Sequence, residues 1–174
     1  DYTRDPAVLQ RVYPILSGAA LFLSLVMDDH DGTWLIRYSA SSEQFRNGKP
    51  YRTTGCSFDQ QMCHEVFRHT LEAAALLHES DTPLLQTLRE RLPRLDPYPI
   101  GISGQIKEFR EEQAYGDIGE RNHRHMSHLL GIYPGTGLSP EDTPLRDAAR
   151  TTLTLRGAGE CGWASAHRAC LWAR

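Results

Sequence analysis

The strongest constraint on this chain is the spacing of its apolar residues, which recur every three to four positions over several long stretches. After Pro14, for example, apolar side chains continue at these steps from Ile15 to Val26. This spacing lines up apolar side chains along one face of an α-helix. We therefore expect an all-α chain of about five helices joined by long, uneven loops. The expected helices cover residues 14–27, 57–77, 83–92, 143–156 and 163–174, with a short one at 126–132.

Residues at the ends of these stretches predict where the helices begin and end. Pro14 suits a first helical position, where its missing N–H is harmless. Ser57 to Gln60 has the pattern of a capping box. Gly157 follows the fourth stretch at the position that often ends a helix. Residues 39–55 are polar and predict a long loop, and loops of that length are often functional.

Length and charge narrow the class of protein. The chain has 174 residues, 24% of them charged, and a formal net charge of -3, which fits one ordinary globular domain. A near-neutral charge argues against a nucleic-acid partner, which usually needs a basic face. We find no apolar run of the roughly 20 residues that span a bilayer and no signal peptide, so we expect no membrane partner. Because the chain starts without Met and stops inside a predicted helix, we expect a piece of a longer protein.

Cysteine and histidine spacing gives little support for a metal site. No two of the four cysteines have the C-x-x-C spacing of zinc and redox sites. They are interpreted as small buried residues, with a bridge between distant cysteines as the alternative. His123, His125 and His128 crowd together, but H-x-H-x-x-H differs from zinc spacings such as H-E-x-x-H. We therefore expect no metal ion and no cofactor.

Three loop-to-helix regions hold polar clusters that could carry chemistry. Glu43 lies in the long loop, where burial would raise the pKa of its carboxyl and let it act as a general acid; the alternative is a solvated loop glutamate. Arg124 and the histidines around it suit a hydroxyl-rich or anionic ligand, or serve ordinary helix capping. Trp163 follows a glycine turn and would either offer its ring to a sugar or pack in the core.

These clusters lie within longer motifs that resemble one known family. Residues 123–135 (HRHMSHLLGIYPG) are close to its block H-R-H-V-S-H-L-Y-G-L-Y-P-G, and residues 39–44 (SASSEQ) resemble its loop P-S-x-S-P-E-N. Similar segments are 13–20 (Y-P-[LI]-[LM]-K-G-A-A), 58–61 (T-M-D-x-Q), 65–67 (E-L-F), 105–109 (Q-L-Q-E-W), 155–164 (L-R-G-D-G-G-T-G-W-S) and 171–174 (L-W-A-R). In this order and over nearly the whole chain, the motifs resemble glycoside hydrolase family 95, the inverting 1,2-α-L-fucosidases.

The resemblance implies a fold and a division of roles. The implied fold is an (α/α)6 barrel, a ring of paired helices around a central pocket, and residues 1–174 would be a fragment of that single catalytic domain. Inverting hydrolysis uses one carboxyl to protonate the leaving oxygen and a second group to activate a water. By their places in the motifs, Glu43 would be the general acid and Asp59 the second candidate. The residues implied in sugar binding are His123, Arg124, His125, His128 and Trp163.

The chain also departs from the family pattern. The loop S-P-E-N becomes Ser42-Glu43-Gln44, without the Pro and the Asn. The N-x-N pair and the Q-I-D-G-N-F-G motif, which activate the water in the family, are not within this chain. The resemblance implies a fucosylated glycan as substrate, an inactive fragment, and a protein exported to the extracellular or periplasmic space. An α-L-galactosidase of the same family and a non-catalytic carbohydrate-binding helical module are the alternative hypotheses.

Overall fold

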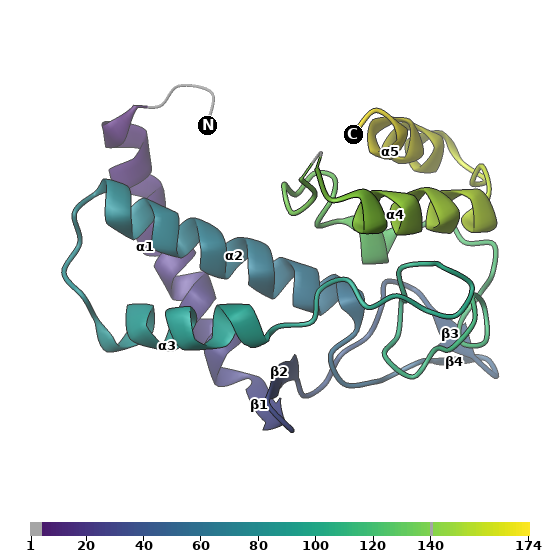
Figure 1. Ribbon diagram of the computed structural model, residues 1–174, viewed down its shortest axis with the longest axis horizontal. Coiled ribbons are helices and arrows are strands. Elements are labelled where there is room, and N and C mark those ends of the chain that lie inside the picture. Colours follow the sequence, from purple (N-terminus) through teal and green to yellow (C-terminus); the bar gives the residue numbers. More distant parts are fainter. Residues whose placement is uncertain (1–4, 140) are drawn as a thin grey trace.

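The computed structural model describes residues 5–139 and 141–174, and they form five α-helices joined by long loops (Figure 1). The prediction of about five helices is therefore confirmed, although two small antiparallel hairpins accompany them. The helices are α1 (Pro6–Leu25), α2 (Ser57–Leu76), α3 (Pro83–Arg91), α4 (Thr143–Arg156) and α5 (Gly162–Trp172), with 3-10 turns η1 (Leu92–Arg94) and η2 (Ser127–Leu129). The hairpins pair β1 (Met27–His30) with β2 (Thr33–Ile36) and β3 (Phe45–Arg46) with β4 (Lys49–Pro50).

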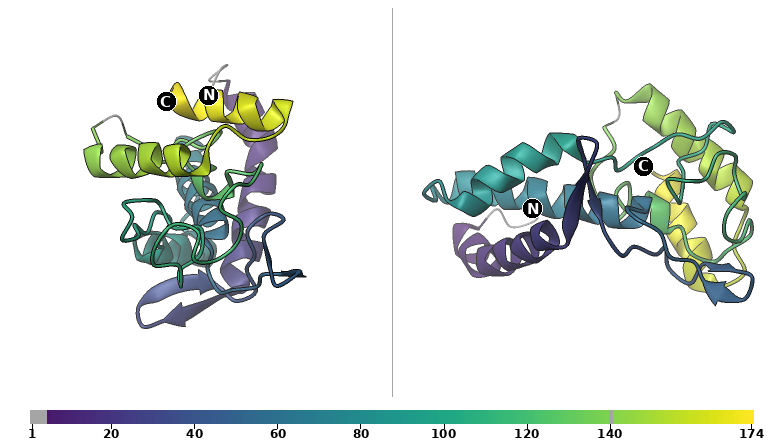
Figure 2. Two further views of the ribbon diagram at one scale, coloured as in Figure 1. Left: turned by 90° about the vertical axis from the view of Figure 1, so that its right-hand side faces the viewer. Right: turned by 90° about the horizontal axis from the view of Figure 1, so that it is seen from below.

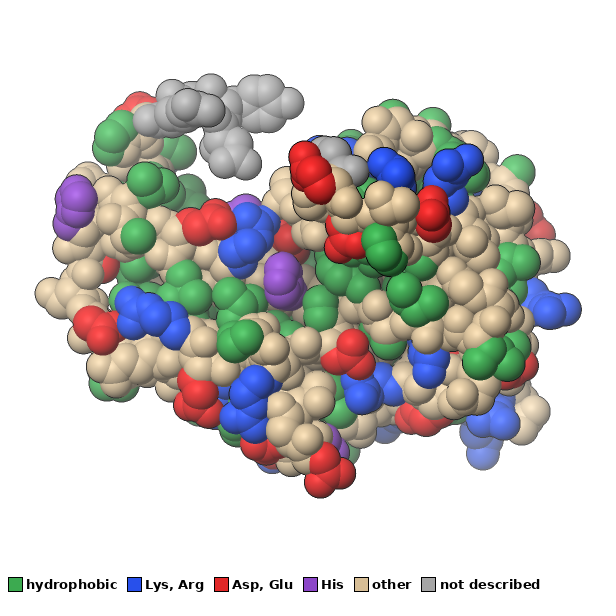
Figure 3. Space-filling view, viewed as in Figure 1, with side chains coloured by type: hydrophobic (Ala, Val, Ile, Leu, Met, Phe, Trp, Pro, Cys, Tyr) green, Lys and Arg blue, Asp and Glu red, His purple; other side chains and the backbone are tan. Residues whose placement is uncertain are grey.

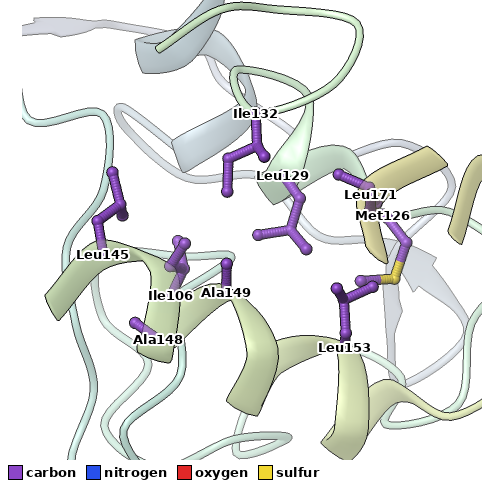
Figure 4. Close-up of a cluster of buried hydrophobic side chains, with 9 residues drawn as sticks. All are labelled: Ile106, Met126, Leu129, Ile132, Leu145, Ala148, Ala149, Leu153 and Leu171. Carbon is purple, nitrogen blue, oxygen red and sulfur yellow. The ribbon is translucent and has the colours of Figure 1, made fainter. Parts of the chain in front are cut away.

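The helices divide into two groups, with α1, α2 and α3 on one side and α4 and α5 on the other (Figures 1 and 2). Each group has its own cluster of buried apolar side chains. The first cluster contains Ala20, Met27, Ile36, Cys63, Phe67 and Leu88. The second contains Ile106, Met126, Leu129, Ile132, Leu145, Ala148, Ala149, Leu153 and Leu171 (Figure 4). Loop residues 95–135 contribute four members of the second cluster, so burial fixes this long loop against α4 and α5.

Helix α1 is longer than the sequence predicted and contains Pro14 in its interior. The prediction that Pro14 opens the helix is wrong, because Pro6 takes that position and the Asp5 carboxylate accepts a hydrogen bond from the Ala7 amide at 2.9 Å. Proline in a helix interior removes one backbone hydrogen bond. The helix continues through it because α1 packs along α2, where Ala20 and Phe67 share the buried cluster.

Much of the apolar surface of α1 is exposed. By length and composition alone, α1 is long and apolar enough to cross a membrane, and only 11% of its most apolar stretch is buried. The statement that no run reaches this length is therefore wrong, although core helices pass the same test. Large exposed side chains include Ile15, Phe22 and Leu25. In the space-filling view, hydrophobic side chains gather over the α1–α3 group (Figure 3).

The start of α2 is fixed by distant segments instead of by a capping box. Cys56 is the N-cap and provides no side-chain hydrogen bond to the helix. The Ser57 hydroxyl donates to the carbonyl of Lys107, and the Gln60 carbonyl oxygen accepts from the Asp96 amide at 3.1 Å. The predicted capping box is therefore wrong, because both of its polar side chains bind backbone groups of the loop over residues 95–109.

Gln61 attaches the histidine-rich segment to α2. Its amide nitrogen donates to the carbonyl of His128 at 2.7 Å, and its carbonyl oxygen accepts from the Gly131 amide at 2.9 Å. The predicted helix over 126–132 is wrong, since only the turn η2 forms there. Gln61 takes the place of helical hydrogen bonds in satisfying the buried backbone of this segment.

Helix α4 has the limits that the sequence predicts. Asp142 caps α4 by accepting from the Leu145 amide at 3.1 Å, and Gly157 ends the helix with a φ of 75°. That stop confirms the prediction, because glycine takes a positive φ without steric cost.

All four cysteines are free thiols, with Cys56 and Cys63 buried.

Candidate functional site

Glu43 lies at the tip of a tight turn between two buried residues. The Gln44 amide donates to the Ser41 carbonyl at 3.3 Å, which closes the turn around Ser42 and Glu43. Ser41 and Gln44 are buried, with 3% and 1% of their surface exposed, whereas Glu43 is exposed. The turn therefore presents the carboxyl of Glu43 outward from two anchored neighbours.

Arg124 and His125 come to this carboxyl from more than 80 residues along the chain. The Arg124 guanidinium donates to Oε2 of Glu43, and Nε2 of His125 lies 2.8 Å from the same oxygen. About half of each of the Glu43 and Arg124 side chains is exposed, so water screens the pair. Three of the residues predicted from the sequence thus meet at the surface, where a ligand can reach them.

Trp163 completes a surface cluster that we define as Glu43, Arg124, His125 and Trp163. The rings of His125 and Trp163 lie with centroids 4.8 Å apart and planes inclined by 44°. Trp163 is the second residue of α5 and is 50% exposed. An exposed indole beside charged donors offers an apolar face and hydrogen-bonding groups together, which is a combination that suits a sugar ring.

The surroundings of Glu43 lower the pKa of its carboxyl instead of raising it. The hydrogen bond from His125 is the main cause that holds the pKa of the Glu43 carboxyl below its ordinary value, and the charge of Arg124 adds to it. The expectation that burial raises this pKa is wrong for the ligand-free chain, because the side chain is half exposed. Glu43 is thus an ionised carboxylate at neutral pH when no ligand is bound.

His123 lies behind the surface cluster. Its side chain is 2% exposed, and its Nδ1 accepts a hydrogen bond from the His125 amide at 3.2 Å. Burial lowers the pKa of His123, and the charge of Arg156 lowers it further. A neutral imidazole in this position orients the backbone of His125 and does not itself face solvent.

Asp59, the second predicted acid, occupies a separate environment at the start of α2. Its Oδ2 accepts a hydrogen bond from the Ser39 hydroxyl at 2.6 Å, and the Ser39 oxygen accepts from the Cys56 amide at 2.8 Å. Burial raises the pKa of the Asp59 carboxyl, against the opposing effect of Ser39. Within the described residues, no hydrogen bond or ion pair joins Asp59 to Glu43.

His128 is fully inside the protein, in what we call the buried network: Ser41, Glu108, His128 and Arg156. The Ser41 hydroxyl and the Arg156 guanidinium both donate to the Glu108 carboxylate. Nδ1 of His128 lies 3.5 Å from the Arg156 guanidinium and 3.8 Å from Oε1 of Glu108. Burial lowers the pKa of His128 to about 4, so the ring is neutral at physiological pH. His128 is therefore placed with the groups that support the turn, and not with the surface cluster.

The side chains described here do not gather into a metal site, since no group of three or more His, Cys, Asp or Glu residues in residues 5–139 and 141–174 is arranged to hold an ion. The surface cluster instead offers hydrogen-bonding side chains and one aromatic ring to a ligand.

The whole chain, residues 1–174, matches the model of the glycosyl hydrolase family 95 catalytic domain. The chain belongs to family 95. It is 36% identical to the probable alpha-fucosidase A of Aspergillus niger over 186 aligned positions, which cover 99% of this chain and 23% of that protein. It is also 36% identical to the probable alpha-fucosidase A of Aspergillus oryzae, covering 83% of this chain and 21% of that protein. The alpha-L-fucosidase 2 of Arabidopsis thaliana is 32% identical, with 99% and 21% covered. The chain thus spans about a fifth of the length of these relatives.

In this family 95 chain, sequence reasoning missed the residues that hold the surface cluster from behind. The guanidinium of Arg168, which is 4% exposed, donates to the backbone carbonyls of His123 at 2.7 Å and Arg124 at 3.0 Å. Its Nε donates to the carbonyl of Gly157 at 2.7 Å. Arg168 therefore ties the segment that carries Arg124 to the end of α4. The sequence signal that could have found Arg168 is a charged residue on the inner face of a predicted helix. A charged side chain is rarely buried there unless it has a specific partner.

Glu108 and Arg156 lie within the family-like segments 105–109 and 155–164, but the sequence assigns no role to either residue. The two residues lie 48 positions apart, and their side chains are 6% and 1% exposed. Burial raises the pKa of Glu108, while the charge of Arg156 and the hydrogen bonds from Ser41 and Arg156 outweigh it and hold the pKa below the ordinary value. The outcome is an ionised carboxylate paired with a guanidinium inside the protein.

Proposed function

We propose that this chain is part of an inverting α-L-fucosidase that removes terminal α-1,2-linked fucose from glycans, with Glu43 as the general acid. The observation that carries the proposal is the convergence of Glu43, Arg124, His125 and Trp163 at one exposed point. Family membership and the names of the relatives support a fucosidase-type glycoside hydrolase. The substrate class that follows is a fucosylated oligosaccharide or glycan, and no other partner is invoked.

In the proposed reaction, the bond between the anomeric carbon of fucose and the glycosidic oxygen breaks. Glu43 gives its proton to that oxygen, which leaves with the bonding electron pair as a neutral hydroxyl. A water attacks the anomeric carbon from the opposite face, and a base outside this chain takes its proton. The product is β-L-fucose, because attack on the opposite face inverts the configuration.

Glu43 must be protonated to act as an acid, whereas the ligand-free surroundings favour its ionised form. A bound sugar would reverse this preference in two ways. Its hydroxyls would compete for the donors of Arg124 and His125, and its ring would exclude water from the carboxyl. Loss of donors and loss of hydration both raise the pKa of a carboxyl. Trp163 would support the apolar face of the sugar while His125 stays packed against it.

We also propose that the five helices form part of an (α/α)6 barrel and that residues 1–174 belong to a single catalytic domain. Coverage of about a fifth of the relatives supports this, because those relatives extend well beyond the matched region. The exposed apolar face of α1 fits further helices packing against it. Export to the extracellular or periplasmic space stays a proposal that rests on the family resemblance.

The test is hydrolysis of 2′-fucosyllactose by the full-length protein that contains this chain. Glu43→Gln keeps the shape of the side chain and removes the transferable proton, so we expect kcat to fall by about 10²–10⁴-fold. Glu79→Gln, at an exposed glutamate just beyond α2, is the matched control and should retain the wild-type rate. Full activity in Glu43→Gln together with a large loss in Asp59→Asn would transfer the acid role to Asp59.

Two further results would redirect the proposal. Faster hydrolysis of the corresponding α-L-galactoside than of the fucoside would make the protein an α-L-galactosidase. Binding of fucosyllactose without any hydrolysis by the full-length protein would make the chain part of a carbohydrate-binding module. Both measurements use the same protein preparation.

A further inference from the structure

Glu43 has a strained backbone that something must hold in place. Its φ is 55°, in the left-handed region that side chains with a Cβ avoid. Such a conformation persists only where the surrounding structure fixes it, and it is often found at functional positions. The carboxyl itself is exposed and contacts only surface groups, so the fixing contacts must come from the residues on either side of it.

The first fixing contact acts two residues before Glu43. The buried Ser41 hydroxyl donates to Oε1 of Glu108, whose other oxygen, Oε2, accepts from the Arg156 guanidinium. The Glu108 amide is itself fixed, because it donates to the Glu112 carboxylate at 2.8 Å. Arg156 thus reaches the start of the turn through one side chain.

The second fixing contact acts one residue after Glu43. The carbonyl oxygen of the buried Gln44 side chain accepts from the Glu120 amide at 2.7 Å. The carbonyl of the same residue, Glu120, accepts from the second terminal nitrogen of Arg156 at 2.8 Å. Since Gln44 also donates through its amide to the Ser41 carbonyl, the two contacts close into a ring of hydrogen bonds with Arg156 opposite Glu43.

We propose that Arg156 is a positioning residue for Glu43, holding both ends of its turn through Glu108 and Ser41 on one side and Glu120 and Gln44 on the other. This inference rests on the proposed role of Glu43 as the acid. Arg156 does not touch the substrate. Its function is to keep the Glu43 carboxyl aimed at the glycosidic oxygen while the solvent-facing groups exchange partners with the sugar.

An arginine is required here because the two contacts diverge. The planar guanidinium presents several donors in a fixed fork, whereas a lysine ammonium is a single point on a flexible stem. Arg156→Lys therefore keeps the charge beside Glu108 but cannot hold the Glu120 carbonyl in the same geometry. The substitution separates the positioning role from the neutralisation of a buried carboxylate.

Substrates with different leaving groups distinguish positioning of an acid from general damage to the protein. The leaving oxygen of 2′-fucosyllactose needs a proton, whereas fluoride departs from α-L-fucosyl fluoride as an anion with the electron pair of the C–F bond. Water adds to the carbon and gives its proton to the same base in both reactions. A misplaced Glu43 slows the first reaction and leaves the second nearly unchanged. Loss of folded protein slows both reactions equally.

The experiment measures the ratio of kcat values on these two substrates for the full-length protein and its variants. We expect Arg156→Lys to lower the ratio by about 10–100-fold, because small displacements of a reacting group cost that much. Ser41→Ala and Gln44→Leu each remove one contact and should each lower the ratio by a smaller factor. Arg150→Lys, the same substitution at an exposed position of α4, should leave the ratio unchanged.

An unchanged ratio in Arg156→Lys and in both single-contact variants would overturn the inference, and a fall in only one single-contact variant would overturn the two-sided arrangement. If Arg156→Lys does not fold, Ser41→Ala and Gln44→Leu decide the matter by the same criterion. Failure of the wild-type protein to hydrolyse either substrate would refute the proposed function separately. Crystal structures of the single-contact variants would then test the positioning: a displaced Glu43 turn supports it, and an unmoved turn overturns it.

Discussion

The chain contains two clusters of one glutamate, one arginine and one histidine, in opposite surroundings. Glu43, Arg124 and His125 lie at the surface, with 51%, 48% and 28% of their side chains exposed. Glu108, Arg156 and His128 lie inside, with 6%, 1% and 1% exposed. The same three residue types therefore serve two different functions. The exposed ion pair can exchange its partners for those of a ligand at little cost, whereas the buried pair cannot be separated without leaving a charge in the interior.

Removing Glu108 should give the largest change in stability. Glu108→Leu leaves the Arg156 guanidinium buried without its carboxylate, which we expect to destabilise the protein by about 3–5 kcal/mol. Glu43→Gln, its exposed counterpart, should leave the midpoint of thermal unfolding unchanged. Thermal unfolding of the two full-length variants beside the wild type measures the contrast, and equal midpoints would remove the distinction between the clusters.

The buried histidine should make stability depend on pH. The pKa of His128 is lowered by burial to about 4, against about 6.5 in an unfolded chain, so the unfolded state binds the extra proton first as pH falls. Stability should therefore be unaffected by this group above about pH 6.5 and decrease from there to about pH 4, by at most about 3 kcal/mol. His128→Gln should flatten that part of a plot of thermal midpoint against pH. An identical slope in the variant would show that His128 is not buried in its neutral form.

Removing both members of the buried pair should separate its structural role from its positioning role. Glu108→Leu combined with Arg156→Met leaves no unpaired charge, so we expect most of the stability lost in Glu108→Leu to return, to within about 1–2 kcal/mol of wild type. Hydrolysis of 2′-fucosyllactose should stay low, because the Glu43 turn has lost both anchors. Recovery of stability and activity together would mean that the pair serves only to neutralise charge.

The smallest expected effect concerns the pH profile at the surface. His125→Phe keeps a ring packed against Trp163 and removes the main group that lowers the pKa of Glu43. The pKa of Glu43 should rise toward its ordinary value, so the alkaline decline of kcat/KM should move to higher pH, since the acid then keeps its proton longer. Trp163→Phe, which leaves Nε2 of His125 in place, should not move the decline. A shift to lower pH in His125→Phe would contradict the electrostatics described for the surface cluster.

Local patterns in the sequence predict the secondary structure well and the contacts between distant segments poorly. The five helices and the stop of α4 at Gly157 follow from apolar spacing and from residues adjacent in the chain, whereas the cap at Asp142 does not. The local patterns at Pro14 and Ser57 predict the helix starts wrongly, because packing against α2 and hydrogen bonds to the loop over 95–109 outweigh the local preferences. Local patterns carry no information about such distant partners.

The candidate site shows the same division. Motif order predicted Glu43, Arg124, His125 and Trp163 together, and the structure brings them into contact. The direction of the pKa shift of Glu43 could not be predicted, because it depends on exposure and on partners more than 80 residues away. The roles of Arg156 and Arg168 were missed for the same reason, since their partners are backbone carbonyls and a carboxylate that only the fold brings near.

The most direct test of the central claim, that Glu43 donates the proton, is the dependence of Glu43→Gln on the leaving group. In the full-length protein the variant should lose about 10²–10⁴-fold in kcat on 2′-fucosyllactose, as expected for loss of a general acid. On α-L-fucosyl fluoride, whose fluoride leaves without a proton, its kcat should remain near the wild-type value. An equal loss on both substrates, or no loss on either, would contradict the assignment of Glu43 as the acid.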